Sequence, residues 1–174
     1  MILLTKADFS GFHLLAKSIA GNPILDDYIL RYEESYIKKI FGVELGQIII
    51  DSLPEGSGSE EIPQRILDAI NPFILQPIQK IWESKGLVDI LASLVYYHFI
   101  CDTQPKHGQS GVVINQVEVG DIQGYQNAVR FAEKKWNNCL ESIEAIQWYC
   151  GQEKKSNYPE YKGRRFDPNY TSMI

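Results

Sequence analysis

The sequence predicts a mainly α-helical fold: a bundle of four to five helices, one extended arm or β-hairpin, and an irregular C-terminal tail. Apolar residues recur at steps of three and four along several segments, which is the spacing of amphipathic helices. Residues 102–121 are instead rich in turn signals and β-branched residues. The last 24 residues show no period. The expected division is therefore a bundle domain over residues 1–150, which includes the arm, and a C-terminal arm over residues 151–174.

The first half of the chain is predicted to be a series of helices separated by glycine, proline or polar turns. Gly42 is expected just beyond the end of the second helix, where a left-handed backbone favours glycine. The polar, glycine-rich run 54–61 predicts a loop. The predicted segments are residues 1–23 (a short helix or packed arm), 24–41, 43–53, 62–71 and 73–82, the last with a break or kink at its prolines.

Two helices in the second half are predicted to pack against each other. Residues 87–101 are almost entirely apolar but too short to span a bilayer, so they predict a buried core helix and no membrane partner. Residues 122–150 alternate apolar steps of three and four around Trp136, and Gly151 is expected to end this helix. A coiled coil fits this seam, but flanking aromatic residues widen the stripe and favour packing within a bundle.

The segment between these helices contains Val112, Val113 and Ile114, a run that disfavours a flexible polar loop. It predicts a β-hairpin or an ordered arm. As an interaction element, it would add a strand to a partner's sheet. The alternative is a hairpin folded back on its own bundle.

The C-terminal tail combines aromatic residues with arginines, a mixture that is enriched at interfaces. It carries five basic and three acidic side chains, whereas the whole chain has a formal net charge of −5. The tail is expected to dock on another chain rather than complete its own core, although a solvated tail fits the charge equally well. The candidate interface residues in the tail are Tyr158, Tyr161, Arg164, Arg165, Phe166 and Tyr170.

No catalytic or cofactor-binding motif occurs in the sequence, so we expect no enzyme activity, no cofactor and no metal. His98 and Cys101 are spaced to share one helix face, but a structural zinc site needs four ligands. His98 is therefore expected to be a partly buried, hydrogen-bonded side chain. The acidic net charge likewise does not favour specific binding of free nucleic acid.

Four features of the chain resemble a known family. They are the opening over residues 2–8, the tyrosine-rich helix over 28–42, the helix ending at Thr103 with Gly111-Val-Val after it, and the long helix followed by Asn157-Tyr-Pro-Glu-Tyr. Together they resemble the head–tail connector (adaptor, or head-completion) proteins of tailed bacteriophages, in the variants found in Bacteroidetes-type phages. The resemblance spans nearly the whole chain and includes no catalytic motif.

The resemblance implies a structural virion protein that forms a ring adaptor between the portal and the tail. It implies a homo-oligomeric ring, a dodecamer, with the portal and the tail or neck proteins as partners. The protein would be made in the bacterial host cytoplasm and reside at the neck of the virion, where DNA passes through without specific binding. The alternative function is a non-enzymatic intracellular protein-binding or regulatory helical module, and a small helical enzyme is a weaker third hypothesis.

Overall fold

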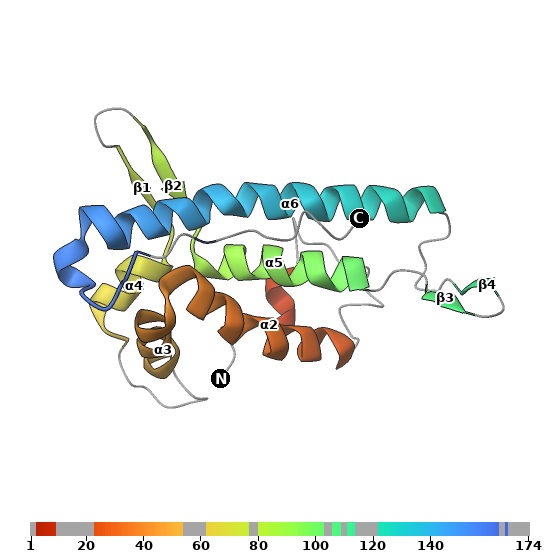
Figure 1. Ribbon diagram of the computed structural model, residues 1–174, viewed down its shortest axis with the longest axis horizontal. Helices are drawn as coiled ribbons and strands as arrows, with labels where there is room; N and C mark the ends of the chain where they lie inside the picture. Colours follow the sequence, from red (N-terminus) through yellow and green to blue (C-terminus); the bar gives the residue numbers. More distant parts are fainter. Residues whose placement is uncertain are drawn as a thin grey trace.

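The computed structural model describes residues 3–9, 23–53, 62–76, 80–102, 106–108, 111–113, 122–163 and 166. Helices dominate these residues, and two short antiparallel hairpins project from them (Figure 1). The predicted mainly α-helical class is confirmed. In chain order the elements are η1 (Lys6–Phe9), α2 (Pro23–Phe41), α3 (Val43–Ser52), α4 (Gln64–Ile70), β1 (Phe73–Leu75), β2 (Trp82–Ser84), α5 (Leu87–Asp102), β3 (Lys106–Gly108), β4 (Gly111–Val113), α6 (Ile122–Trp148), η3 (Tyr149–Glu153) and η4 (Lys155–Asn157).

The body of the molecule consists of three long helices, with α5 lying between α6 and α2 (Figure 1). The position of α5 follows from its composition, because a helix that is apolar on all sides must be covered on all sides. Leu87, Leu91 and Val95 are fully buried. The ring of Tyr97 on α5 lies 4.9 Å from that of Trp136 on α6. The predicted packing between these two helices is therefore confirmed.

The predicted seam of α6 is also confirmed within the described part of the helix. Trp136 is 6% exposed, and Ile143 and Ile146 are buried in the core. The helix does not end at Gly151 as predicted, because a π-helical turn, η3, continues through this residue. Glycine suits the close packing there, since an added Cβ would lie 2.9 Å from the ring of Tyr161 and would displace that ring.

The corner between α2 and α3 forms at Gly42, whose φ of 81° places it in the left-handed region. This confirms the predicted end of α2. The Gly46 N–H donates to the Gly42 carbonyl, 2.9 Å away, and starts α3. A Cβ at Gly46 would lie 2.9 Å from the Cα of Lys38. The two helices pack tightly because this position has no side chain.

The predicted kinked helix over residues 73–82 is wrong, because this region contains the antiparallel hairpin of β1 and β2. Phe73 pairs with Ser84, and Leu75 pairs with Trp82. Its inner face is fixed to the body by ring contacts: Trp82 stacks on Trp148 of α6, with ring centres 5.8 Å apart. These contacts join segments that are far apart in the sequence. The sequence pattern within two three-residue strands therefore could not predict the hairpin.

The second hairpin, β3 and β4, projects beyond the ends of α5 and α6 (Figure 1). His107 pairs with Val112, and Lys106 pairs with Val113. These strands confirm the β-hairpin predicted within residues 102–121. Ile114 lies outside the described residues.

Candidate protein interfaces

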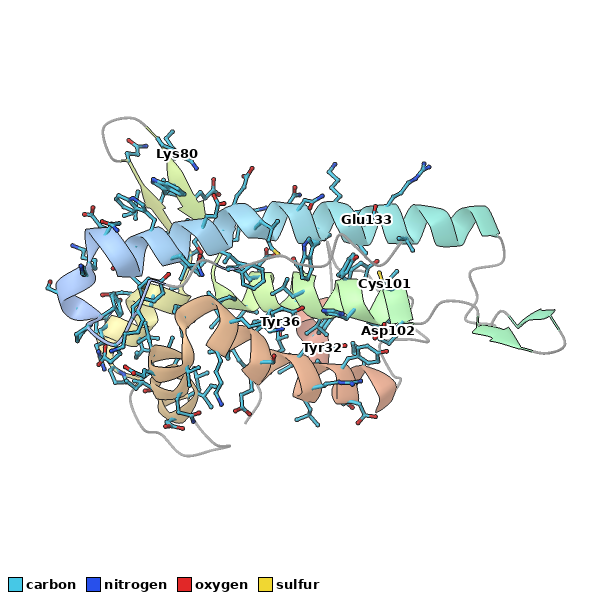
Figure 2. The ribbon with its side chains drawn as sticks, in the orientation of Figure 1. Tyr32, Tyr36, Lys80, Cys101, Asp102 and Glu133 are labelled. Atoms are coloured by element: carbon cyan, nitrogen blue, oxygen red, sulfur yellow. The ribbon has the colours of Figure 1, made fainter. Side chains whose placement is uncertain are left out.

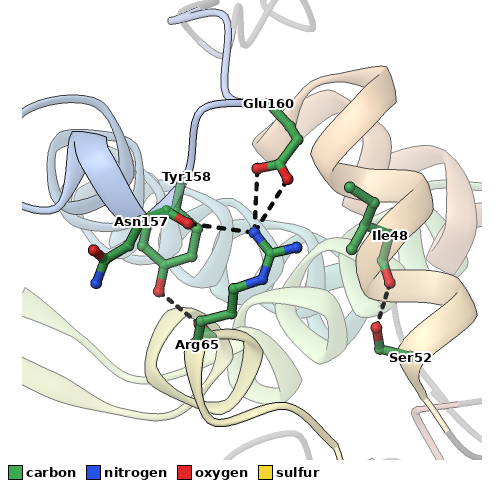
Figure 3. A network of polar contacts seen from close by, with 6 residues as sticks. All are labelled: Ile48, Ser52, Arg65, Asn157, Tyr158 and Glu160. Atoms are coloured by element: carbon green, nitrogen blue, oxygen red, sulfur yellow. Dashed lines mark hydrogen bonds and ion pairs between the residues drawn. The ribbon is translucent and has the colours of Figure 1, made fainter.

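The C-terminal segment packs on its own bundle as far as the structure describes it. Tyr158 is 1% exposed, and its hydroxyl donates a 2.6 Å hydrogen bond to the backbone carbonyl of Arg65 in α4 (Figure 3). Phe166 is 8% exposed and contributes to the same core. The expectation that these two aromatic side chains anchor on another chain is therefore wrong. A tail without a period can still complete a core, because two well-placed aromatic side chains bury large apolar areas.

The Arg65 side chain contacts this C-terminal segment at the surface of the fold. Its guanidinium lies 3.1 Å from the Glu160 carboxylate and 3.3 Å from the Asn157 carbonyl (Figure 3). A hydrogen bond from the backbone N–H of Glu160, and then the Arg65 guanidinium, lower the pKa of the Glu160 carboxyl. Arg65 and Glu160 are both partly exposed, so this ion pair positions the chain more than it stabilises the fold.

A side-chain amide connects the end of the described tail to the helices. The Phe166 N–H donates to Gln147 Oε1, 3.1 Å away, and Gln147 Nε2 donates to the Ile40 carbonyl, 3.0 Å away. Gln147 on α6 therefore joins the tail to the end of α2. Half-buried Tyr161 packs over Gly151, and burial raises the pKa of its hydroxyl to about 12.

The remaining predicted interface residues fall into two groups. Val112 and Val113 lie on β4 of the projecting hairpin, in register with His107 and Lys106. The others, Arg164, Arg165 and Tyr170, lie outside the described residues. Of the predicted interface residues in the tail, only half-buried Tyr161 and the three that the structure does not describe remain candidates.

His98 occupies a buried aromatic centre between α2 and α5. It is 7% exposed and shares a hydrogen bond with the Tyr36 hydroxyl, as expected for a buried histidine. The Tyr32 ring stacks on its imidazole at 4.1 Å (tyrosines labelled in Figure 2). Burial lowers the pKa of His98, whereas the nearby Asp102 carboxylate raises it. The arrangement is that of a packed, neutral imidazole.

The outer face of the β1–β2 hairpin is the exposed apolar surface that the sequence did not predict. Ile74 is 62% exposed and Ile81 is 64% exposed. The Lys80 amine does not belong to this face, since its Nζ lies 3.6 Å from the centre of the Trp82 ring on the inner side of the hairpin (Lys80 labelled in Figure 2). The sequence offered no alternating signal here, because Ile81 and Trp82 are both apolar and Glu83 and Ser84 are both polar.

A cavity of about 420 Å³ lies between α2 and α3, on the side of the body away from the β1–β2 hairpin (helices in Figure 1). Glu33 at its wall is 6% exposed and accepts hydrogen bonds from the backbone N–H groups of Leu3 and Leu4. Burial raises the pKa of the Glu33 carboxyl, and the two N–H groups partly oppose this. The lining residues are Leu30, Glu33, Glu34, Ile37, Ile50, Asp51 and Leu53.

A second cavity, of about 670 Å³, is open to solvent beside the base of the same hairpin. Trp82 and Trp148 form part of its wall, and Tyr161, Lys155 and Lys162 come from the C-terminal segment. Lys162 is held by an ion pair with Glu44, 3.1 Å away. The cavity thus marks the place where the hairpin, the end of α6 and the tail meet.

Within the described ranges the chain has neither a cluster of metal ligands nor a helix that could cross a membrane. Among those residues, no group of three or more His, Cys, Asp or Glu side chains is placed to hold a metal ion. None of the described helices combines the length and apolarity needed to cross a membrane. The cysteines Cys101, Cys139 and Cys150 are free thiols. No protein-family model, curated protein or solved structure matches this chain.

Proposed function

We propose that this chain is a structural virion protein that forms a ring adaptor between the portal and the tail of a tailed phage. The observation that carries the proposal is a helical body from which two hairpins project in different directions (Figure 1). One hairpin exposes Ile74 and Ile81 to solvent, and the other places Val112 and Val113 beyond the helix ends. Projecting strands of this kind are suited to contacts with neighbouring chains.

The sequence resemblance to head–tail connector proteins supports the same role. A ring adaptor must contact copies of itself on two sides and two different partners along the ring axis. A body with a buried core and separate projecting elements can supply these contacts without a large conformational change. The partners in this proposal are the portal and the tail or neck proteins, and DNA passes through the ring without specific binding.

The proposal is tested by deleting the gene from a phage or prophage that carries it and viewing the lysate by electron microscopy. A neck adaptor predicts heads and tails that fail to join, with tailed particles restored when the gene is supplied in trans. Normal numbers of intact, infectious tailed particles in the deletion lysate would exclude the role. That result would favour the alternative, a non-enzymatic protein-binding or regulatory module.

A further inference from the structure

We infer that His98 and Asp102 form an acid-sensitive switch that releases α2 from the end of α5. The switch goes beyond the proposed function, because it depends only on contacts inside this chain. It is an exchange of partners. In the neutral state His98 and Asp102 each hold a tyrosine of α2, and in the protonated state they pair with each other.

Tyrosine hydroxyls of α2 contact polar side chains in the last turns of α5. The Tyr36 hydroxyl shares a hydrogen bond with His98 Nε2, and the Tyr28 hydroxyl donates to Asp102 Oδ2, 3.1 Å away (Tyr36 and Asp102 labelled in Figure 2). His98 and Asp102 are one helical turn apart, so they lie on the same face of α5. A change in the charge of one therefore acts on both contacts with α2.

His98 is held in its neutral form by the side chains around it. Its imidazole stacks on the Tyr32 ring, with ring centres 4.1 Å apart, and Trp136 of α6 meets it edge-on at 6.1 Å. Burial lowers the pKa of His98, because a cation removed from water loses its solvation. Protonation is therefore resisted for as long as α2 covers the ring.

The charges that act on His98 come from α2 and α5. Arg31 and Lys39 on α2 disfavour a further cation beside them, whereas the carboxylate of Asp102 favours it. Other side chains against the ring carry no charge near neutral pH: Tyr32, Tyr36, Tyr97 and Trp136. Asp102 is thus the carboxylate that can compensate a charged His98.

A proton taken up from solvent by His98 makes a buried cation, which requires a counter-charge. Asp102 is exposed at the end of α5, so its carboxylate is able to turn towards the imidazolium one helical turn away. In turning inward it leaves the Tyr28 hydroxyl, which it meets at the surface. The imidazolium, protonated on both nitrogens, also no longer accepts a hydrogen bond from Tyr36. One protonation therefore weakens both polar contacts between the helices.

Acid favours the released state. When α2 is released, His98 is open to water and its pKa approaches the ordinary value of 6.5, so the released state binds protons more readily than the closed state. Release should therefore grow as the pH falls below about 6.5. Asp102 is the last residue of α5, shortly before β3 begins, so the change occurs at the base of the projecting β3–β4 hairpin (Figure 1).

The test is hydrogen–deuterium exchange of the full-length protein between pH 5 and 8, with rates corrected for the intrinsic effect of pH. The amides of α2 should lose protection several-fold as the pH falls, whereas those of α6 around buried Ile143 and Ile146 should keep theirs. Circular dichroism should show that most of the helix content remains. Equal loss of protection in α2 and α6 would mean global unfolding and would overturn the switch.

Three variants assign the release to these residues. Asp102→Asn still accepts a hydrogen bond from Tyr28 but offers no counter-charge, so the midpoint of α2 release should move to lower pH. Asp89→Asn, the same change in the first turn of α5, is the matched control and should keep the wild-type midpoint. In His98→Gln the protection of α2 should no longer depend on pH in this range.

PH-dependent release that survives in His98→Gln overturns the inference, as does a wild-type midpoint in Asp102→Asn. Asp102 is exposed, so its variant provides the test even if His98→Gln fails to fold. These outcomes leave the neck role to the deletion experiment, because the switch is measured on the purified chain alone.

Discussion

The hydroxyl of Tyr158 donates a 2.6 Å hydrogen bond to the backbone carbonyl of Arg65, across 93 residues of sequence. This bond joins the C-terminal segment to α4, and the ring that carries it is 1% exposed. Burial raises the pKa of the Tyr158 hydroxyl well above its ordinary range, so the group remains a neutral donor. The beginning of the tail is thus part of the folded core.

Tyr158→Phe should therefore lower the free energy of unfolding by about 1 kcal/mol, because it removes the hydrogen bond and keeps the ring in place. Urea denaturation monitored by circular dichroism measures the change. Lys155→Ala is the control: Lys155 is an exposed residue in the same segment and should change stability by less than about 0.5 kcal/mol. Equal midpoints for the two variants would show that the hydroxyl bond does not contribute.

Truncation after Gly151 should destabilise the protein strongly. It removes Tyr158 and Phe166 from the core, and loss of one large buried aromatic side chain alone costs about 3–5 kcal/mol. The melting temperature of the truncated chain should fall by many degrees, or the chain should fail to fold. A truncated chain with an unchanged melting temperature would contradict the packing described for this segment.

Stability should decrease on the acid side because of His98. Burial holds the pKa of His98 in the folded chain below its ordinary value of 6.5, so the unfolded chain binds more protons as the pH falls. The free energy of unfolding should therefore be fully retained above about pH 6.5 and decline as the pH falls from 6.5 towards the folded pKa. Glu33 changes the stability with pH in the opposite direction, because burial raises the pKa of its carboxyl in the folded chain.

The measurement is the slope of melting temperature against pH between pH 5 and 8. His98→Gln retains hydrogen-bonding capacity but cannot titrate, so its slope should be shallower than that of the wild type whatever its absolute stability. Glu33 remains in both proteins, so its contribution cancels in the comparison. Identical slopes would show that His98 does not cause the acid sensitivity.

Replacing Val112, Val113 and Ile114 together by serine should disrupt assembly with little effect on the melting temperature. Val112 and Val113 lie on β4, which projects beyond the helix ends, so the bundle core should not depend on them (Figure 1). Native electrophoresis measures assembly, and differential scanning fluorimetry measures the melting temperature. A large fall in melting temperature with intact assembly would mean that this hairpin supports its own bundle.

The helical part of the fold was accessible from the sequence because its signals are local. The apolar periods that define α2, α5 and α6 lie within single helices, and the left-handed glycine at Gly42 marks the end of one of them. Burial of Trp136 follows from its central position on the seam. Each of these properties depends on neighbours within one or two helical turns.

The β1–β2 hairpin and the packing of the tail were not accessible for the opposite reason. Trp82 is held by Trp148, and Tyr158 is held by Arg65, both through contacts between distant segments. Strands of three residues are too short for an alternating pattern to be distinguished from a broken helix. The exposed isoleucines of the hairpin could be recognised only once the inner face of the sheet was known.

Native mass spectrometry of the purified full-length chain, alone and mixed with a candidate portal protein from the same genome, tests the central proposal most directly. We expect a closed oligomer near the twelve copies that the resemblance implies, or a complex in which a ring of this chain binds the portal. A chain that remains monomeric or dimeric in both samples, with no portal complex at any concentration tested, would contradict it.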